Sequence, residues 1–571
     1  MKFRRRLATV AGVIALVGCA ACQRRSADAL AAGAASEKTV VASIRAEPRS
    51  FNRYTTRDLT GVVIGYLSHS SLVRINRQTD RLEPELAEGW DLLPDGLTYR
   101  LKLRPGVQFS DGHPFSSADV VFSFAAIYDP DAGGLLADTL QVRGKPLIVR
   151  AEAANVITVR FPFPFAPGLR ILDGVPIYPR HRLESALTAG TFTSAWGLST
   201  PLSELAGLGP FVLQRYEPGQ RLVFDRNPRY WRNDAGGHAL PAVDHVVLDI
   251  IPDQDTEQLR IASGDVDFTQ SELRPSDYAP MKRAEADGRV KLTDLGEGRD
   301  GDLLWFNLTP SLKNDPRAAW LQSATFRRAV SQAVDRDLFV NTVYLGAAVP
   351  GYGVVSPGNH GWYTDVSAPG YDAAAAAASL AGLGLADRHG DGKLTDAKGV
   401  PVRFSLLTQK GNTSLERGAE MIRESLGRLG IQVDVVDFEV GALIHQFSKG
   451  EYDAVYFRLL TTDTDPVLNL DFWLSSGSAH VWHPSQTSPA TPWEQEIDRL
   501  MNEITTITDQ NRRRTLFADV QRIMAHEAPA ICFAFPKLWF AMNGRIEQAT
   551  PAPFRPPVMW NPAVLSLRTP G

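Results

Sequence analysis

The sequence predicts an α/β protein with more than one domain. Segments of alternating apolar and polar residues, which indicate strands, are interleaved with segments whose apolar residues recur at helical spacing. The chain has 571 residues, which is more than one compact core normally accommodates. Hydrophobic residues make up 44% of the chain and charged residues 22%, a balance that is typical of globular proteins.

Two strands and a helix are predicted in the first third of the chain. Alternation indicates a strand at 39–44 and another at 97–103, and the second one runs into a Pro-Gly turn. Ser116 or Ser117 can cap a helix, because a hydroxyl at this position accepts a hydrogen bond from a free backbone NH of the first turn.

The second half of the chain continues the pattern. Apolar residues recur at helical spacing between Ala324 and Tyr344, and an amphipathic helix is predicted from Leu415 to Leu429. An alternating strand follows at 431–435. Strands and helices therefore alternate along the chain.

The N-terminus predicts export. The first six residues are rich in Lys and Arg, and the apolar run from Leu7 to Val17 is shorter than the roughly 20 residues that span a bilayer. Such a run behind a positive segment is typical of a signal peptide. No later segment is apolar over a comparable length, so nothing else is expected to cross a membrane.

The end of the apolar run resembles the lipobox of bacterial lipoproteins. Leu16-Val17-Gly18-Cys19 places small residues before a cysteine, whose thiol would receive the lipid. The alternative is an ordinary export signal that contains a cysteine, and Cys22 is the weaker lipidation candidate. We expect a leader at 1–19, a membrane anchor on Cys19 and an Ala- and Ser-rich tether at 20–38.

Composition argues against several functions. The formal net charge of −4 gives no electrostatic reason to expect a nucleic acid partner. Cys532 is the one cysteine of the body, in an apolar setting, so we expect a buried thiol and no internal disulfide. We find none of the common hydrolase, metalloprotease or nucleotide-binding motifs.

Three stretches carry a family resemblance. They are PELAEGW at 84–90 with DGLTY at 95–99, LRPGVQFSDGHPF at 103–115 and DVVFS at 119–123; GPFVL at 209–213 with YEPG at 216–219 and RNPRYW at 226–231; and FN at 306–307 with FRRAVSQAVDR at 326–336. In this order they resemble the family 5 extracellular solute-binding proteins, the dipeptide and oligopeptide receptors of ABC importers. Physically, the Asp-Gly and Pro-Gly pairs are turns and the aromatic residues suit cores, so we expect these motifs to specify the fold and not to contact ligand.

The resemblance implies a bilobal fold of the periplasmic-binding-protein type II class with an additional third domain. The expected parts are lobe I at 39–72, 205–300 and 540–571, domain II at 73–204, and lobe III at 301–539. A ligand would lie between the lobes, and hinge closure would bury it.

The resemblance also implies site residues. In the family, an Asp shortly before a Pro binds the ammonium of the peptide, and here Asp463 falls at that position, three residues before Pro466. Asp465 is a second candidate, although it more simply shapes the turn. Arg458 is a candidate partner for a ligand carboxylate or for Asp463. The family usually has Gly-Trp where this chain has Leu459-Leu460, so an aromatic wall is expected to be missing and a standard dipeptide ligand is in doubt.

The expected function is that of a monomeric, membrane-anchored receptor outside the cytoplasmic membrane. It would bind a small peptide or peptide-like ligand, without a cofactor, and deliver it to ABC permease subunits. A receptor for a sugar, an opine or a metal complex is the main alternative, and an enzyme or a structural envelope lipoprotein is a further one.

Two polar segments suggest metal sites and are set aside. The stretch from Asp387 to Asp396 resembles the start of a calcium loop, but His389 at its third position and Lys398 at its twelfth do not fit, so a polar surface turn is expected. His480 and His483 have no third ligand nearby in the sequence. We therefore expect no metal.

Overall fold

The computed structural model describes residues 38–56, 58–132, 136–309, 314–366, 369–461 and 463–568. The leader, most of the tether and the predicted lipidation site Cys19 lie outside these residues. Among the described residues, no helix combines the length and apolar character needed to cross a membrane.

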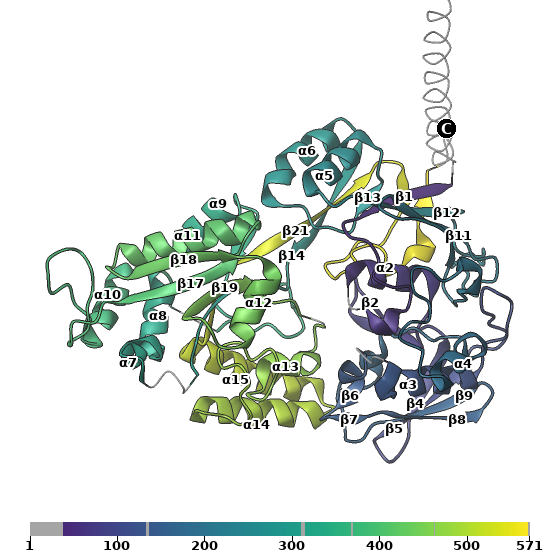
Figure 1. The fold of residues 1–571 in the computed structure, drawn as a ribbon, viewed down its shortest axis with the longest axis horizontal. Helices are drawn as coiled ribbons and strands as arrows, with labels where there is room; N and C mark the ends of the chain where they lie inside the picture. The colour runs from purple at the N-terminus through teal and green to yellow at the C-terminus, as the bar shows by residue number, and fades with distance from the viewer. Residues whose placement is uncertain are drawn as a thin grey trace, which may run out of the picture.

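Three sheets organise the chain (Figure 1). We call the part built on the eight-stranded mixed sheet lobe I, the part built on the four-stranded antiparallel sheet domain II, and the part built on the five-stranded sheet lobe III. In lobe I the strand order is β10 (Phe211–Glu217), β11 (Arg221–Arg226), β12 (His245–Ile250), β1 (Thr39–Ile44), β13 (Phe268–Thr269), β21 (Ala534–Asn543) and β14 (Val290–Glu297), with β16 (Ala348–Pro350) also paired to β21. In domain II it is β4 (Ala87–Leu92), β5 (Thr98–Leu103), β9 (Val156–Arg160) and β8 (Ile148–Ala153). In lobe III it is β18 (Gln432–Phe438), β17 (Arg403–Gln409), β19 (Ala454–Arg458), β15 (Asp302–Phe306) and β20 (Ala530–Cys532).

Helices cover these sheets. Lobe I carries α2 (Leu59–Ser68), α5 (Gln254–Ser263) and α6 (Tyr278–Ala286), and domain II carries α3 (Ser117–Tyr128) and α4 (Arg180–Thr188). Lobe III carries α7 (Ala318–Leu321), α8 (Ala324–Ala333), α9 (Arg336–Val343), α10 (Ala373–Gly382), α11 (Thr413–Gly427), α12 (Val440–Ser448), α13 (Leu470–Trp473), α14 (Pro492–Thr506) and α15 (Gln510–Glu527). Short two-stranded ladders pair β2 (Val73–Asn76) with β3 (Arg81–Pro84), β6 (Gln141–Val142) with β7 (Lys145–Pro146), and β22 (Ile546–Gln548) with β23 (Ser566–Leu567).

The central strands are buried on both faces. In β15, Leu304 and Phe306 join the core on one side of the lobe III sheet, while Leu303 and Trp305 join the core on the other side. Burial of both faces explains why β15 reads as a nearly continuous apolar run.

The predicted cap at Ser116 is confirmed, the helix predicted at 415–429 begins two residues earlier as α11, and one predicted helix is divided. Ser116 caps α3 in a capping box with Asp119. The apolar pattern from Ala324 to Tyr344 forms two helices, α8 and α9, because the chain is extended at Val334 and the Asp335 side chain caps the first turn of α9. Apolar periodicity alone does not reveal such a break.

The family motifs build the fold, as expected. Phe109, Phe115 and Tyr230 are buried, and Trp90 and Trp231 pack against the core clusters. In the third motif, the buried Arg327 guanidinium donates to the backbone carbonyls of Gln322, Glu527 and Ala528. This side chain therefore joins the start of α8 to the end of α15.

Candidate ligand-binding cleft

Among the described residues, the chain passes between the sheets of lobe I and lobe III through short segments, including those on either side of β16. Residues 298–301 connect β14 to β15, and Phe533 alone separates β20 from β21. The first segment contacts β21, because the Gly298 NH donates to the Pro536 carbonyl at 2.7 Å. Figure 1 shows β21, in yellow, running from lobe III into lobe I.

A cavity of about 300 Å³ lies beside β21, and we call it the interlobe cavity. Its volume is at the lower end of the range for small-molecule sites. The lining residues from lobe I include Arg45, Gln270, Glu272, Arg274, Tyr278 and Arg555. Those from lobe III include Tyr344, Asn412, Ser414 and Arg458. Strand β21 contributes Pro536, Lys537, Leu538 and Trp539. Residues of both lobes therefore line the same cavity.

Arg458, a predicted carboxylate partner, ends β19 at this cavity. Its Nε donates to Asp302 Oδ1 at 2.6 Å, and Asp302 also accepts the Tyr344 hydroxyl. Asp302 holds the pKa of Arg458 above its usual value against the lowering effect of burial. Within the described part of the chain, the terminal nitrogens Nη1 and Nη2 have no hydrogen-bond partner, so they are available to a ligand.

A second cavity, of about 150 Å³, lies beneath the loop that carries Asp463, and we call it the loop cavity. Its walls are mainly apolar and include Leu459 and Leu460, which stand where the family usually has Gly-Trp. Phe472 and Trp473 of α13 and Phe517 of α15 also line it. Helices α13 and α15 therefore give this cavity an aromatic surface at positions other than Leu459-Leu460.

Asp463, the predicted ammonium ligand, borders the loop cavity and is bound to domain II. Its Oδ1 accepts Arg170 Nη2 at 2.7 Å, and the same guanidinium nitrogen binds Asp80 Oδ1 at 2.9 Å. The Asp463 side chain is only 7% exposed. In this conformation, a peptide ammonium would compete with Arg170 for the Asp463 carboxylate.

Asp465, the other predicted binding residue, is held within lobe III. Its carboxylate forms two hydrogen bonds with Arg513, at 2.7 and 2.8 Å, and caps the 3-10 helix η8 (Pro466–Asn469). Burial raises its pKa, against the lowering effect of Arg513. This carboxylate shapes the turn and lines neither of the two cavities.

Arg299 is a basic residue of this region that sequence reasoning missed. It lies in the 298–301 segment, lines the loop cavity, and stacks over the Phe554 ring with 3.7 Å between Cζ and the ring centroid. Its Nε and Nη1 atoms are buried and have no hydrogen-bond partner in the part of the chain that the structure describes. Burial lowers its pKa to about 10, so it remains charged at neutral pH. In the sequence it stands in a run of Gly and charged residues that resembles any solvated loop.

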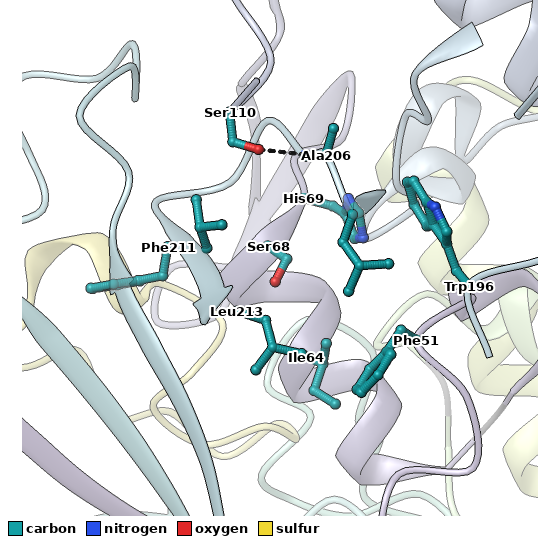
Figure 2. A pocket seen from close by; sticks show the side chains of 12 residues that line it. Phe51, Ile64, Ser68, His69, Ser110, Trp196, Ala206, Phe211 and Leu213 are labelled. Carbon is teal, nitrogen blue, oxygen red and sulfur yellow. Dashed lines mark hydrogen bonds between the residues drawn. The ribbon is translucent and has the colours of Figure 1, made fainter. Parts of the chain in front are cut away.

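A third pocket, between lobe I and domain II, is too small for a solute. Its volume is about 20 Å³, room for one water molecule, and mainly apolar side chains line it (Figure 2). His69 lies in it, stacked on Trp196, and burial lowers the pKa of this imidazole to about 4.

The segments that suggested metal sites have other partners. The exposed Asp387 carboxylate accepts backbone NH groups of residues 389–392, which closes a polar surface turn. His480 Nε2 faces Glu494 Oε1 at 3.3 Å in the core of lobe III. The described residues contain no group of three or more His, Cys, Asp or Glu side chains arranged to hold a metal ion. Cys532 is buried, as predicted.

The fold and its two-walled cavity are those of a solute-binding protein. The oligopeptide-binding protein AppA of Bacillus subtilis, solved with a nonapeptide, matches with a TM-score of 0.72 and 24% identity over 93% of this chain and 99% of that chain. NikA of Brucella suis, solved with Fe(III)-EDTA, matches with a TM-score of 0.74 and 19% identity over 93% of this chain and 100% of the other. These likenesses establish the bilobal type II fold with its third domain.

Sequence comparison identifies the family. Residues 81–480 match the bacterial extracellular solute-binding proteins, family 5, and the chain belongs to this family. It is 27% identical to the dipeptide-binding protein of Escherichia coli over 526 residues, which covers 88% of this chain and 90% of the relative. It is 24% identical to a probable ABC transporter-binding protein of Deinococcus radiodurans over 503 residues, which covers 84% of each chain. The predicted family and fold class are confirmed.

Proposed function

We propose that this protein is the substrate-binding subunit of an ABC importer, and that it takes up peptides or peptide-like solutes between its lobes. The observation that carries the proposal is the interlobe cavity, which lobe I, lobe III and the crossing strand β21 wall together. A ligand in such a space stabilises the closed arrangement, because only there does it contact both lobes. Binding of this kind makes and breaks no covalent bond, so we propose a receptor and not an enzyme.

Similar proteins support a peptide-like ligand. Relatives of similar length are named dipeptide-, di/tripeptide- and oligopeptide-binding proteins. One relative is named heme-binding protein A, and one solved structure of this fold holds agropinic acid. A non-peptide solute is therefore the second candidate.

The predicted division into lobe I, domain II and lobe III, with the leader and the Cys19 anchor, forms part of the same proposal. The anchor would keep the receptor outside the cytoplasmic membrane and near its permease. Arg458 is the predicted contact residue that the cavity geometry favours, because its terminal nitrogens are available there.

Mass spectrometry of small molecules released from the denatured protein tests the proposal. We expect a solute at close to one molecule per chain, released with unchanged mass after incubation. Ser414→Trp, which places an indole in the interlobe cavity, should remove it, and Thr413→Trp, at the exposed neighbouring position, should not. A protein that releases no solute and gains no thermal stability from a peptide pool, or that converts its solute to product, is not this receptor.

A further inference from the structure

The acidic groups of the two cavities are already engaged. Glu272 of the interlobe cavity binds Arg555 at 3.3 Å, and Asp463 of the loop cavity binds Arg170. Asp300, also in the loop cavity, accepts both the NH and the hydroxyl of Thr461 at 2.8 Å. Each carboxylate that lines either cavity therefore has a donor before a ligand arrives.

The basic groups of the interlobe cavity outnumber the acidic ones. Five basic residues line it and one acidic residue does. Three of the five have carboxylate partners, since Arg274 pairs with Asp255 and Asp277, Arg458 with Asp302, and Arg555 with Glu272. The other two, Arg45 and Lys537, stand outside these ion pairs.

Lys537 and Arg45 form no ion pair with a described residue. Arg45 is exposed, and among the described residues its guanidinium donates to neutral oxygens, the Pro252 carbonyl at 3.4 Å and Gln254 Oε1 at 3.3 Å. Lys537 is half-buried on β21, and its ammonium has no hydrogen bond to any residue that the structure describes. Glu297 lies opposite Lys537 in the β14–β21 ladder but forms no ion pair with it, so this half-buried ammonium is available to an anionic ligand.

Gln270 adds a neutral polar contact. It lines the interlobe cavity, the residue is 3% exposed, and neither its Nε2 nor its Oε1 has a hydrogen-bond partner among the described residues. Buried amides are normally satisfied, because an unpaired donor or acceptor costs about 1–3 kcal/mol. A ligand with both a donor and an acceptor, such as a peptide group, would satisfy both atoms.

We propose that the interlobe cleft selects an acidic peptide or peptide-like carboxylate, bound by Lys537, Arg45 and the terminal nitrogens of Arg458, with Gln270 on a peptide group. Arg299 places a further unpaired guanidinium at the adjoining loop cavity, beside apolar walls that suit an aliphatic or aromatic part of the solute. The proposal rests on the receptor function and names its substrate class.

Three dipeptides that differ in one side chain test the charge preference by calorimetry. Ala-Glu, Ala-Gln and Ala-Lys have the same termini and similar sizes. We expect Ala-Glu to bind about tenfold more tightly than Ala-Gln, and Ala-Lys to bind most weakly. Raising the salt from about 0.05 to about 0.5 M should reduce the affinity for Ala-Glu more than that for Ala-Gln.

Variants that each remove one positive charge identify the side chains responsible for the preference for Ala-Glu. Lys537→Gln and Arg45→Gln should each weaken Ala-Glu binding about fivefold or more and change Ala-Gln binding less than about twofold. Lys291→Gln, on the exposed side of the neighbouring strand β14, is the matched control and should leave both affinities unchanged. Equal weakening of both dipeptides would show that these side chains do not recognise the Glu carboxylate, because both peptides share the C-terminal one, and would overturn the acidic preference.

The result separates this inference from the receptor function. If Ala-Gln or Ala-Lys binds as tightly as Ala-Glu, the acidic preference is wrong and the receptor function stands. If none of the three dipeptides binds, the acidic preference is also wrong. The receptor function is then tested separately, by mass spectrometry of the solutes that the denatured protein releases. An acidic solute among those released supports both.

Discussion

Arg170 of domain II and Asp463 of lobe III form an ion pair at 2.7 Å across 293 residues of sequence. Asp80 strengthens the junction, because it binds the same guanidinium and also accepts the Thr464 hydroxyl at 2.7 Å. The Ala166 NH donates to the Thr505 carbonyl nearby, also at 2.7 Å. Domain II therefore contacts lobe III directly, at the entrance to the loop cavity.

From this ion pair we predict that Asp463 affects ligand affinity by holding domain II against lobe III, and not by binding the ligand itself. Asp463→Asn and Arg170→Gln should each weaken ligand binding by about 2 kcal/mol, the order of cost when a buried ion pair loses one partner. The double variant should cost little more than either single one, because both remove the same interaction. Calorimetry with one dipeptide measures all three.

N-acetylation of the peptide separates this role from the ammonium role that the sequence suggests. If Asp463→Asn weakens the free-amine peptide alone and leaves its N-acetyl form unaffected, Asp463 binds the ammonium and the domain-contact role is wrong. Equal loss for both forms is the result we expect.

The contacts of Arg327, which lies away from the cleft, predict that its removal lowers the free energy of unfolding. Arg327→Ala removes hydrogen bonds to three backbone carbonyls of buried helix ends and should lower the free energy of unfolding by about 3 kcal/mol or more. Arg328→Ala is the matched control, because its bonds to the His526 carbonyl and Thr325 lie nearer the surface. Denaturant titration measures both, and similar midpoints for the two variants would contradict the assignment.

His69 predicts a loss of stability in mild acid. Its pKa is about 4 in the folded protein, because burial disfavours the charged ring, whereas a free imidazole has a pKa near about 6.5. The unfolded chain therefore binds the proton first, and stability falls as the pH drops from about 6.5 towards 4, by at most about 3 kcal/mol.

Comparison with His69→Gln isolates this effect from the carboxylates that titrate over the same range. The difference in the free energy of unfolding between the two proteins should change with pH between about 4 and 6.5 and be constant above it. A constant difference over the whole range would show that His69 does not take up a proton on unfolding.

The burial of Cys532 predicts that its thiol does not react with alkylating reagents in the folded protein. Burial raises its pKa to about 12, and its Sγ packs between two crossing segments of the chain, 2.7 Å and 2.8 Å from where a Cβ on Gly301 or Gly351 would stand. Alkylation at pH 8, mapped by peptide mass spectrometry, should leave Cys532 unmodified in the folded protein and modify it fully in guanidinium. Modification without unfolding would show that the thiol is accessible.

The fold could be predicted where its signals are local. The strand at 39–44 and the cap at Ser116 were predicted because alternation and capping each involve residues close in sequence. The division between α8 and α9 was not, because apolar spacing continues through the break at Val334.

The candidate site could be predicted only in part. Arg458 came from a family motif and does reach the interlobe cavity, whereas nothing marked Gln270, Arg299 or Lys537. These side chains become neighbours of a cavity only after the sheets assemble, and none belongs to a periodic pattern. Asp463 was identified, but its partner Arg170 lies in a different domain.

The narrow connections between the lobes have a consequence for measurement. These connections meet at one place, since the Gly351 NH after β16 donates to the Phe533 carbonyl and the Gly298 NH donates to the Pro536 carbonyl, so opening would approximate a swing about a fixed axis. One spectroscopic distance between a label on α11 and another on α2 would then report the whole transition. Gly301→Ala would obstruct that pivot, since the added methyl carbon would stand 2.7 Å from Cys532 Sγ.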